Sequence, residues 1–491
     1  MTRVSDIMNC INTIESIYNV AAWRVNGLRI WPITRIHLSI LIRDHDFVGP
    51  KIEPHTRRGF ISLLKGFSIS FYSILELMFT PGSWRGFSAV VLTKPSGAHG
   101  EFNTYSGPLQ EKMRNHGTRH LVIEVSNRPS RPRRGGSVLL LDQYWLKIVI
   151  RMLYSTVRLF RRASADLPGY RSVGKLVYAR FPALERHALS KPYMIREAVF
   201  IEAYRLFFGL LLELLRPSKA LIICYYTRLA MGFILAARER HALSADYQHG
   251  VQGKLHYAYG SWKNFPPAGY ELLPDIFLNW SEFEKLSIDQ WAAPTPHQSI
   301  VVGNLLAEHV RNKFASYAQE YGDSLRSLGT KPLVLYSLQN FIPPDWIWDA
   351  IRDTSAELKW LIRLHPMYPN LRKVVRENLQ ARNVKDYDMD QASHLPLPFL
   401  LPNIAVHVTG SSSVVLEALY SGKPSIVIDH YGLEYYADLI AAGNVSAAFD
   451  PWQLGQALYS AISRAPALRP TGQTSSFLQF LDSDVQPRIK T

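Results

Sequence analysis

The sequence predicts an α/β protein with two facing Rossmann-like domains and an N-terminal helical, basic extension. Two observations indicate this fold class. From about residue 87 onward, short apolar runs typical of buried strands alternate with helical stretches, which is the pattern of parallel sheets covered by helices. The second observation is the position of the basic residues. Residues 1–200 hold 29 Lys+Arg and 13 Asp+Glu, in a chain whose net charge is +15.

The composition excludes general disorder. Of the 491 residues, 47% are hydrophobic and only 19% are charged, so the chain can bury large cores, and its length suits two or three domains. The two cysteines, Cys10 and Cys224, fit a reducing compartment and show no zinc-binding spacing. The start shows no secretory signal, and no apolar stretch of about 18 residues is free of charge. We therefore expect a cytoplasmic protein.

Residues 1–80 predict a helical, basic segment. Within Trp23–Arg43, arginines are interleaved with large apolar residues. One interpretation is an amphipathic helix packed on the rest of the protein. The other is a surface that rests on anionic lipid headgroups, which would make the protein peripheral on the inner face of the cytoplasmic membrane.

Residues 81–296 predict the first Rossmann-like domain, with a helical insertion. Residues 143–216 are mainly helical in pattern, and Met231–His241 predicts a further helix. The loop Asn127–Gly136 is rich in Pro, Gly and Arg, which argues against regular structure. The predicted strands are Ser88–Thr93, His120–Val125, Ala220–Tyr226 and Ala245–Gln248.

Residues 297–491 predict the second domain, with the boundary near Pro294–Pro296. The predicted strands are Ser299–Val302, Leu333–Ser337, Trp360–Leu364, Ile404–Val408, Ser425–Ile428 and Val445–Phe449. Helical stretches separate these strands, and the resulting βα units make a complete doubly wound domain.

A loop of small polar residues joins the strand at 404–408 to the next helix. Its members are Thr409, Gly410, Ser411, Ser412 and Ser413. A helix N-terminus presents unpaired N–H groups, and a glycine lets the backbone approach an anion closely. Serine commonly caps helices, but one cap needs one hydroxyl, so three serines indicate a phosphate site. Glu417 follows about one turn later, where its carboxylate suits a ribose diol. The alternative is a solvated helix glutamate.

The motif Arg363-Leu364-His365-Pro366 follows the strand at 360–364. It places a histidine at the carboxyl end of a parallel strand, the edge where such sheets bind ligands. Pro366 favours an extended conformation at His365. A lone histidine is commonly structural, but this one shares an edge with the serine loop. We therefore expect Arg363, His365 and Pro366 to belong to the same phosphate site.

The motif Asp246-Tyr247-Gln248-His249-Gly250 ends a short strand of the first domain. An acid and a histidine three residues apart offer a general base or a nucleophile at neutral pH. The alternative is that Asp246 caps the turn and His249 packs. Glu101, in the loop after the first strand, is a further acid/base candidate. The sequence contains no P-loop, dinucleotide-binding, zinc-protease or nucleophile-elbow motif, and no nucleic-acid recognition motif.

The set of strand-end motifs resembles a known family. Its members here are Gln248-His249-Gly250, Val302-Gly303-Asn304, His365-Pro366 and Ser411–Ser413 with Glu417. They resemble bacterial GT-B glycosyltransferases of capsule, lipopolysaccharide and O-antigen assembly, namely the Kdo transferases and the sialyl- and polysialyltransferases with His-Pro and Ser-Ser motifs. The order of the motifs is also similar to that of teichoic-acid glycerophosphotransferases. The resemblance covers roughly residues 220–445 and implies a GT-B-like fold.

The resemblance implies a role for each site residue. His365 and Ser411–Ser413 would hold the donor phosphate, and Glu417 the ribose of a cytidine nucleotide. Asp246 or His249 would act in the inter-domain cleft, as nucleophile or as base. Gln248, Gly250, Arg363, Pro366 and Gly410 complete the implied donor-binding set. Imidazole, hydroxyls and a helix N-terminus would stabilise the leaving CMP, so neither a metal nor another cofactor is implied.

The implied activity is transfer of a sugar, Kdo or a related acidic sugar, from a CMP-activated donor. The acceptor would be a surface polysaccharide or a lipid-linked glycan, recognised by the first 200 residues, whose positive charge suits an anionic partner. The alternatives are polyol-phosphate transfer from CDP-glycerol or CDP-ribitol and a uridine-sugar enzyme of the same fold. A nucleotide- or glycan-binding module without turnover is the third alternative.

Overall fold

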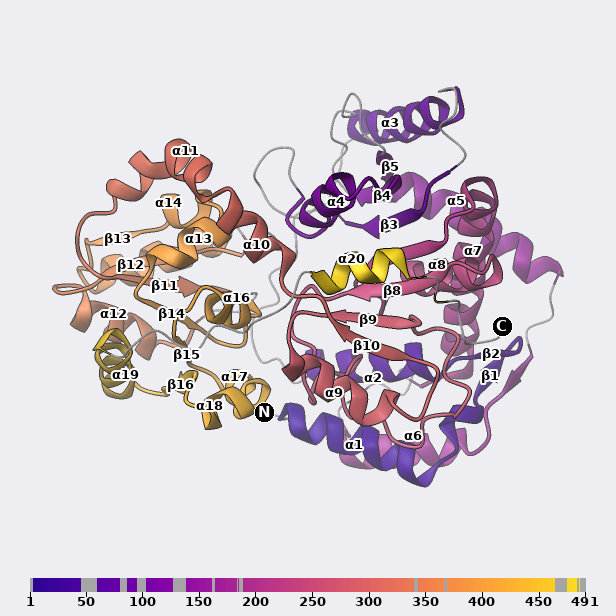
Figure 1. The fold of residues 1–491 in the computed structure, drawn as a ribbon. Helices are drawn as coiled ribbons and strands as arrows, with labels where there is room; N and C mark the ends of the chain where they lie inside the picture. Colours follow the sequence, from indigo (N-terminus) through magenta and orange to yellow (C-terminus); the bar gives the residue numbers. More distant parts are fainter. Residues whose placement is uncertain are drawn as a thin grey trace.

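The chain forms two α/β halves, each built on its own parallel sheet. The computed structural model describes residues 3–45, 60–79, 86–94, 103–126, 138–160, 164–182, 184, 189–339, 343–365, 368, 370–463, 475–483 and 485. Figure 1 shows the two halves side by side, with the N-terminal helices against the first of them.

Seven strands, paired in parallel throughout, form the first sheet, in the order β10-β9-β8-β7-β3-β4-β5. The strands are β3 (Ala89–Thr93), β4 (His120–Ser126), β5 (Val138–Asp142), β7 (Lys219–Ile223), β8 (Leu243–Tyr247), β9 (Ile276–Asn279) and β10 (Gln298–Val301). Every residue of β3, β7, β8 and β9 is buried, as expected for strands covered on both faces. The associated helices are α4 (Ser106–Asn115), α5 (Gln143–Phe160), α7 (Lys191–Leu215), α8 (Arg228–Glu239) and α9 (Glu282–Ala292).

Six parallel strands form the second sheet, in the order β13-β12-β11-β14-β15-β16. The strands are β11 (Leu333–Ser337), β12 (Lys359–Arg363), β13 (Tyr387–Asp388), β14 (Val406–Thr409), β15 (Ser425–Val427) and β16 (Val445–Ala447). The helices are α10 (Leu305–Asn312), α11 (Phe314–Arg326), α12 (Trp346–Thr354), α13 (Leu371–Ala381), α14 (Asp390–His394), α15 (Leu397–Leu400), α16 (Val414–Tyr420), α17 (His430–Tyr435), α18 (Ala437–Ala441) and α19 (Pro451–Ser463). The prediction of two Rossmann-like domains is confirmed.

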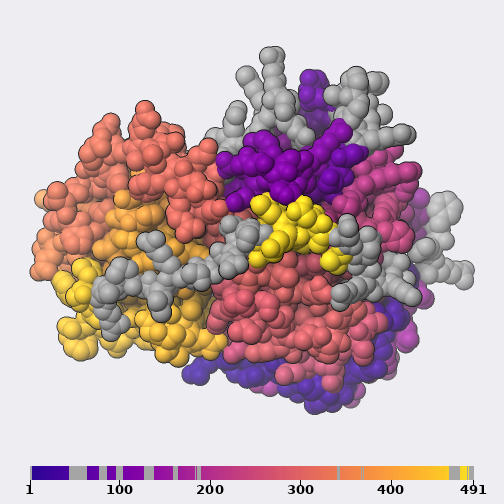
Figure 2. All heavy atoms as spheres, viewed as in Figure 1, coloured from indigo at the N-terminus to yellow at the C-terminus, as the bar shows by residue number. Residues whose placement is uncertain are grey.

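Two elements cross the boundary predicted near residue 295. β10 pairs with β9 and forms the edge of the first sheet, whereas the sequence placed this strand at the start of the second domain. The helix α20 (Ser475–Asp482) packs on the first half with Phe477 and Phe480 buried, and Lys219 Nζ donates to the carbonyl of Ser483 (2.8 Å). Figure 2 shows α20 in yellow, lying across the first half. The second sheet gains β13 in place of β10.

The N-terminal segment is mainly helical, as predicted, and most of it is core. It contains α1 (Val4–Ile17), α2 (Trp31–His45), α3 (Phe60–Phe79) and two short strands, β1 (Arg24–Val25) and β2 (Leu28–Arg29), which form a small sheet with β6 (Ala165–Asp166). Arg35 is fully buried, pairs with Glu15 (2.9 Å) and donates to the carbonyl of Gly260 (2.8 Å). Trp31 and Leu38 are also buried. The large apolar side chains of Trp23–Arg43 are therefore packed in the core, which agrees with the first interpretation of this segment.

Among the helices of the described residues, none has the combination of length and apolar character required to cross a bilayer. α3 instead lies against β5, the edge strand of the first sheet. A further helix, α6 (Tyr170–Arg180), lies close to α1.

Candidate functional site

The carboxyl ends of the second sheet's strands bring two predicted motifs to one edge. The serine loop, Gly410–Ser413, joins β14 to α16. β11 lies between β12 and β14, and its Ser337 is in register with both Arg363 and Thr409. His365, two residues past Arg363, therefore follows the sheet at the same level as the serine loop. This is the juxtaposition that the sequence predicted.

The three hydroxyls of the serine loop have different surroundings. Ser412 Oγ accepts a hydrogen bond from the N–H of Val414 (3.3 Å), the first residue of α16, whereas the N-cap residue Ser413 makes no side-chain cap bond. Ser411 donates its N–H to Oε1 of Gln339 (2.8 Å), the second residue after β11. Ser413 Oγ has no hydrogen-bond partner among the described residues. The Ser412 hydroxyl thus bonds the start of the helix, and the Ser413 hydroxyl is left for a ligand.

The loop that follows β8 lies against the serine loop of the second half. A Cβ built on Gly250 would lie 3.7 Å from Cβ of Ser413, so the two loops are within van der Waals range. The buried side chain of Gln248 holds this turn: its Oε1 accepts from Trp280 N (2.7 Å) and its Nε2 donates to the carbonyl of Gly250 (2.9 Å). Two motifs predicted in different domains therefore meet.

His249 lies between two tyrosines at this junction. Its ring centroid is 6.1 Å from that of Tyr105 and 5.9 Å from that of Tyr226, whose hydroxyl is 3.4 Å from His249 Nε2. The Nδ1 atom is buried and has no hydrogen-bond partner among the described residues. Burial, together with the nearby charge of Lys94, lowers the pKa of His249 to about 4. The ring is therefore neutral at pH 7.

Lys94 belongs to the same edge of the first sheet. Leu92 of β3 is in register with Ile222 of β7, and Ile222 is in register with Asp246 of β8. Lys94 and His249 thus follow β3 and β8 at nearly the same level, with β7 between them. Lys94 is exposed, and no carboxylate of the described residues pairs with it. Within the part of the chain that the structure describes, Lys94 is therefore a cation near His249 that no carboxylate neutralises.

Asp246 lies inside the first half rather than in the cleft. It is fully buried; Oδ1 accepts from Tyr225 N (2.9 Å) and Oδ2 from the hydroxyl of Tyr259 (2.7 Å). Burial raises the pKa of Asp246 to about 7, against the opposing effect of these hydrogen bonds. The carboxyl group holds the segment that carries Tyr226 against His249.

Arg363 and Glu417 lie close enough to influence each other's charge, beside the serine loop. The Arg363 guanidinium donates to the carbonyls of Ala392 (2.6 Å) and Leu395 (2.8 Å). Burial raises the pKa of Glu417 to about 7, and the charge of Arg363 opposes this rise. His365 is half-buried beside Tyr368, with ring centroids 5.3 Å apart, and burial lowers its pKa.

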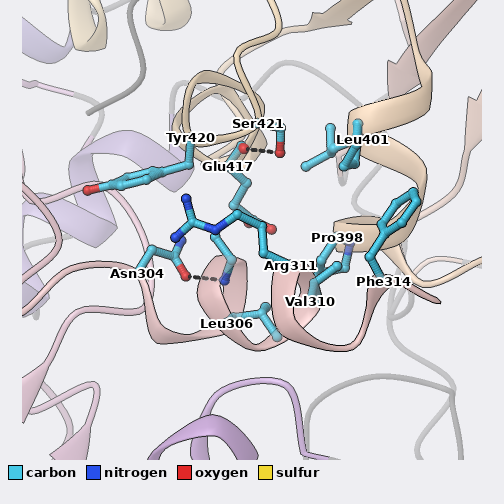
Figure 3. Close-up of a pocket in the computed structure, with 12 residues that line it drawn as sticks. Asn304, Leu306, Val310, Arg311, Phe314, Pro398, Leu401, Glu417, Tyr420 and Ser421 are labelled. Carbon is cyan, nitrogen blue, oxygen red and sulfur yellow. Dashed lines mark hydrogen bonds between the residues drawn. The ribbon is translucent and has the colours of Figure 1, made fainter. Parts of the chain in front are cut away.

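A cavity of about 270 Å³ opens beside Glu417, between α10, α16 and the segment of α15 and the short 3-10 helix that follows it (Figure 3). Glu417 extends into it from α16 and Arg311 from α10. Asn304, predicted within the Val302-Gly303-Asn304 motif, caps α10 by accepting from Ala307 N (3.0 Å). The lining residues are Asn304, Leu306, Ala307, Val310, Arg311, Phe314, Pro398, Leu401, Pro402, Glu417, Tyr420 and Ser421.

A run of three alternating aspartates near β13 has structural partners. Asp386 pairs with Lys331 (2.7 Å) and also with Lys359. Asp388 accepts from Ala392 N (2.9 Å), and Asp390 pairs with Arg372. Within the described residues, no group of three or more acidic, histidine or cysteine side chains is arranged to hold a metal ion.

Two predicted residues, Glu101 and Pro366, lie outside the described residues. Sequence reasoning did not single out Lys94 or Gln339, which the structure places at the site. Both follow a predicted strand by one or two residues, at the edge where ligands bind. A search for polar residues just past each strand would have found them.

No family model matches the sequence, and no curated protein matches it. The UDP-GlcNAc 2-epimerase from Neisseria meningitidis, solved bound to UDP-GlcNAc, is similar with a TM-score of 0.50 at 14% identity, covering 80% of this chain and 99% of that chain. A Listeria monocytogenes protein described as a UDP-N-acetylglucosamine 2-epimerase gives a TM-score of 0.50 at 15% identity, covering 81% of this chain and 95% of that chain. The wall teichoic acid polymerase TagF gives a TM-score of 0.43 at 11% identity, covering 80% of this chain and 88% of that chain.

At these identities the similarity concerns the fold. The chain shares with these structures an α/β architecture of two parallel-sheet domains. The protein therefore has a GT-B-like fold.

Proposed function

We propose that the protein is a glycosyltransferase that moves a sugar from a cytidine-nucleotide donor to a glycan or lipid-linked acceptor, with Kdo or a related acidic sugar as the donor sugar. The observation that carries this proposal is the meeting of Gly250 and Ser413. It brings the strand-end motifs of both sheets together, beside a cavity near the lower end of the size range for small-molecule sites.

The donor nucleotide would occupy the second half. The Ser413 hydroxyl and the His365 ring would contact its phosphate, while Ser411 would exchange its bond with Gln339 for one to a phosphate oxygen. The carboxylate of Glu417 suits a ribose diol, and the apolar walls of the adjoining cavity suit a base. Imidazole and hydroxyl groups would then offset charge on the departing CMP, so the proposal includes no metal.

His249 is the proposed base for the acceptor hydroxyl. The charge of Lys94 and burial keep the ring unprotonated before substrate binds. An anionic donor beside Lys94 would offset that charge and raise the pKa of His249 toward the working range of a general base. We assign Asp246 a positioning role, because both of its oxygens are already engaged in hydrogen bonds inside the first half.

Substitution at the donor site tests this proposal. The double variant Ser412→Ala with Ser413→Ala, and separately His365→Ala, should abolish CMP release from a CMP-activated donor while the circular dichroism spectrum stays unchanged. Ser327→Ala is the matched control, because its exposed hydroxyl, among the described residues, bonds only the carbonyl of Ser324 (2.7 Å). Full transfer by the donor-site variants would contradict the assignment.

Nucleotide binding separates the proposed donor from its competitors. Calorimetry with CMP, CDP and UDP should give tighter binding of the cytidine nucleotides. Preferential binding of UDP would point to a uridine-sugar enzyme instead. Consumption of CDP-glycerol or CDP-ribitol with release of CMP would identify a polyol-phosphate transferase. Binding of cytidine nucleotides without any turnover would indicate a binding module.

A further inference from the structure

Helix α3 is held to the first half by one face and leaves the other uncovered. Asp142 N donates to Ser70 Oγ (2.7 Å), and Gly66 approaches so closely that a Cβ there would lie 2.5 Å from Asp142 Oδ2. The outer face carries Leu64, Phe71 and Tyr72, which are 52%, 61% and 54% exposed. Their spacing of seven and eight residues places them on one side of the helix.

Helix α5 contacts α3 and adds cations to exposed apolar groups. Ile148 and Met152 are one turn apart and exposed, Met152 by 66%. Arg151 lies beside them, and the sequence of α5 contains no Asp or Glu. We call this region the α3–α5 surface and define it by Leu64, Phe71, Tyr72, Ile148, Arg151 and Met152.

The charge around these apolar side chains is positive. Lys65, Lys147 and Arg158 are also exposed on the two helices, and no carboxylate among the described residues forms a salt bridge with them or with Arg151. Glu76 is the one exposed acid of the described part of α3. Exposed apolar groups beside cations that no described carboxylate pairs with match the chemistry of an anionic lipid surface, with acyl chains below and phosphates above.

The α3–α5 surface begins at the ligand-binding edge of the first sheet. Glu124 of β4 is in register with Thr93 and lies two residues before Ser126, which is in register with Asp142. Asp142 therefore ends β5 one residue beyond the level of Lys94, two strands away, and α5 starts at the next residue. Two strand spacings amount to about 10 Å.

We propose that the α3–α5 surface docks the protein on anionic phospholipid, which would place the cleft beside the membrane. The bilayer is a better occupant than a second copy of the chain, because a twofold contact would bring the same cations face to face. The docking itself is independent of the proposed transfer. Docking would let the protein reach a lipid-linked acceptor without leaving the membrane surface. This use of the docking rests on the proposed function.

Vesicle flotation tests the docking. The full chain should float with phosphatidylcholine vesicles that contain phosphatidylglycerol and stay behind with pure phosphatidylcholine. Arg151→Glu should lower the partition coefficient by about tenfold or more, since each basic residue near such a surface contributes about 1 kcal/mol. Phe71→Ser with Tyr72→Ser should lower it by a similar factor. The control is Trp452→Ser, because Trp452 is 73% exposed on α19 of the other half.

Several results would overturn the docking proposal. They are equal flotation of all variants, no flotation of the unchanged protein, and self-association in light scattering that the Phe71 and Tyr72 changes abolish. Melting curves would show that the variants fold. Transfer to a soluble acceptor should survive in these variants, so loss of docking leaves the proposed function intact. Flotation without any transfer would count against the proposed function alone.

Discussion

Two polar atoms at the cleft have no partner among the described residues, Nδ1 of His249 and Oγ of Ser413. Of the two, Nδ1 of His249 is the buried one, and a buried polar atom without a hydrogen bond costs about 1–3 kcal/mol. They belong to facing loops, one from each half of the molecule. We interpret both as atoms whose bonding a substrate completes.

Glu417 should make nucleotide binding depend on pH. Its raised pKa of about 7 means that it is largely protonated at pH 6 and largely ionised at pH 8. Since the carboxylate is the stronger acceptor for a ribose diol, CMP affinity should rise across this range. Glu417→Gln should remove most of the rise and weaken binding about tenfold at pH 8, measured by calorimetry.

The phosphate of CMP also titrates at about pH 6. The CMP affinities of the unchanged protein and of the Glu417→Gln variant must therefore be compared at each pH. The contribution of the phosphate is common to both and cancels in the ratio of their dissociation constants. A ratio that stays constant from pH 6 to pH 8 would mean that Glu417 does not contact the nucleotide.

Asp246→Asn should change the pH dependence of stability. The buried carboxyl has a folded-state pKa raised to about 7, so its contribution to stability is full at low pH and is lost as pH rises through that value. The unfolding free energy of the unchanged protein should fall relative to the Asn variant, by up to about 1.4 kcal/mol per pH unit between about pH 5 and 7. Urea titrations measure this difference.

The same variant separates positioning from chemistry. If Asp246 acts only through Tyr225 and Tyr259, Asp246→Asn should retain measurable transfer. Complete loss of transfer by a stably folded Asp246→Asn protein would instead support a nucleophile or base. His249→Ala should abolish transfer in either case.

The positions of the site residues could be predicted, but their individual roles could not. Strand-end placement of His365, His249 and the serine loop follows from apolar runs that end in polar residues. The sequence does not show that Asp246 would be enclosed by Tyr225 and Tyr259, because this depends on packing between strands and the loop at 256–260. The role of Asp246 could not be predicted because the burial of its carboxyl group decides it.

At the scale of elements, α17 begins in contact with the serine loop. A Cβ on Gly432 would lie 2.1 Å from the carbonyl oxygen of Gly410 and 2.8 Å from Cβ of Val427. Asp429 caps this helix by accepting from Gly432 N (2.6 Å). The close approach is possible only for glycine, so α17 supports the loop that the donor phosphate would contact.

Gly432→Ala should therefore displace the serine loop. We expect a loss of about 1–3 kcal/mol in unfolding free energy and weaker CMP binding. Gly455→Ala is the control, because a Cβ on this helical glycine of α19 meets nothing within 4 Å. It should leave binding unchanged and raise stability by about 0.5–1 kcal/mol. Equal behaviour of the two variants would show that α17 does not support the loop.

Element types were predictable from the sequence, whereas some partners were not. β10 shows the apolar pattern of a strand, but four residues do not reveal which sheet they join. The helix α9 connects β9 to β10 and places β10 parallel to β9 in the first sheet. In α2, Arg35 suggested a surface, yet Glu15 and the carbonyl of Gly260 satisfy it inside the core.

At the scale of the whole molecule, the helix that follows the second half in sequence packs on the first half. α20 buries Phe477, Phe480 and Leu481 against it. Phe477→Ala should lower the unfolding free energy by about 3–5 kcal/mol, because it empties a fully buried aromatic site. Chemical denaturation monitored by tryptophan fluorescence would measure this loss. The exposed residue Trp452 of α19 serves as the control, since Trp452→Ala should change stability by less than about 0.5 kcal/mol.

The packing of α2 has a consequence for synthesis on the ribosome. Arg35 bonds the carbonyls of Tyr257 and Gly260, which are 222 and 225 residues further along the chain. At about 5–20 residues per second, translation delivers these partners roughly ten seconds or more after Arg35 itself. Trp23 Nε1 donates to the carbonyl of Pro168, a partner that follows 145 residues later. The first helices of the nascent chain thus stay unburied until most of the first half has been translated. During this period their apolar side chains are available to chaperones.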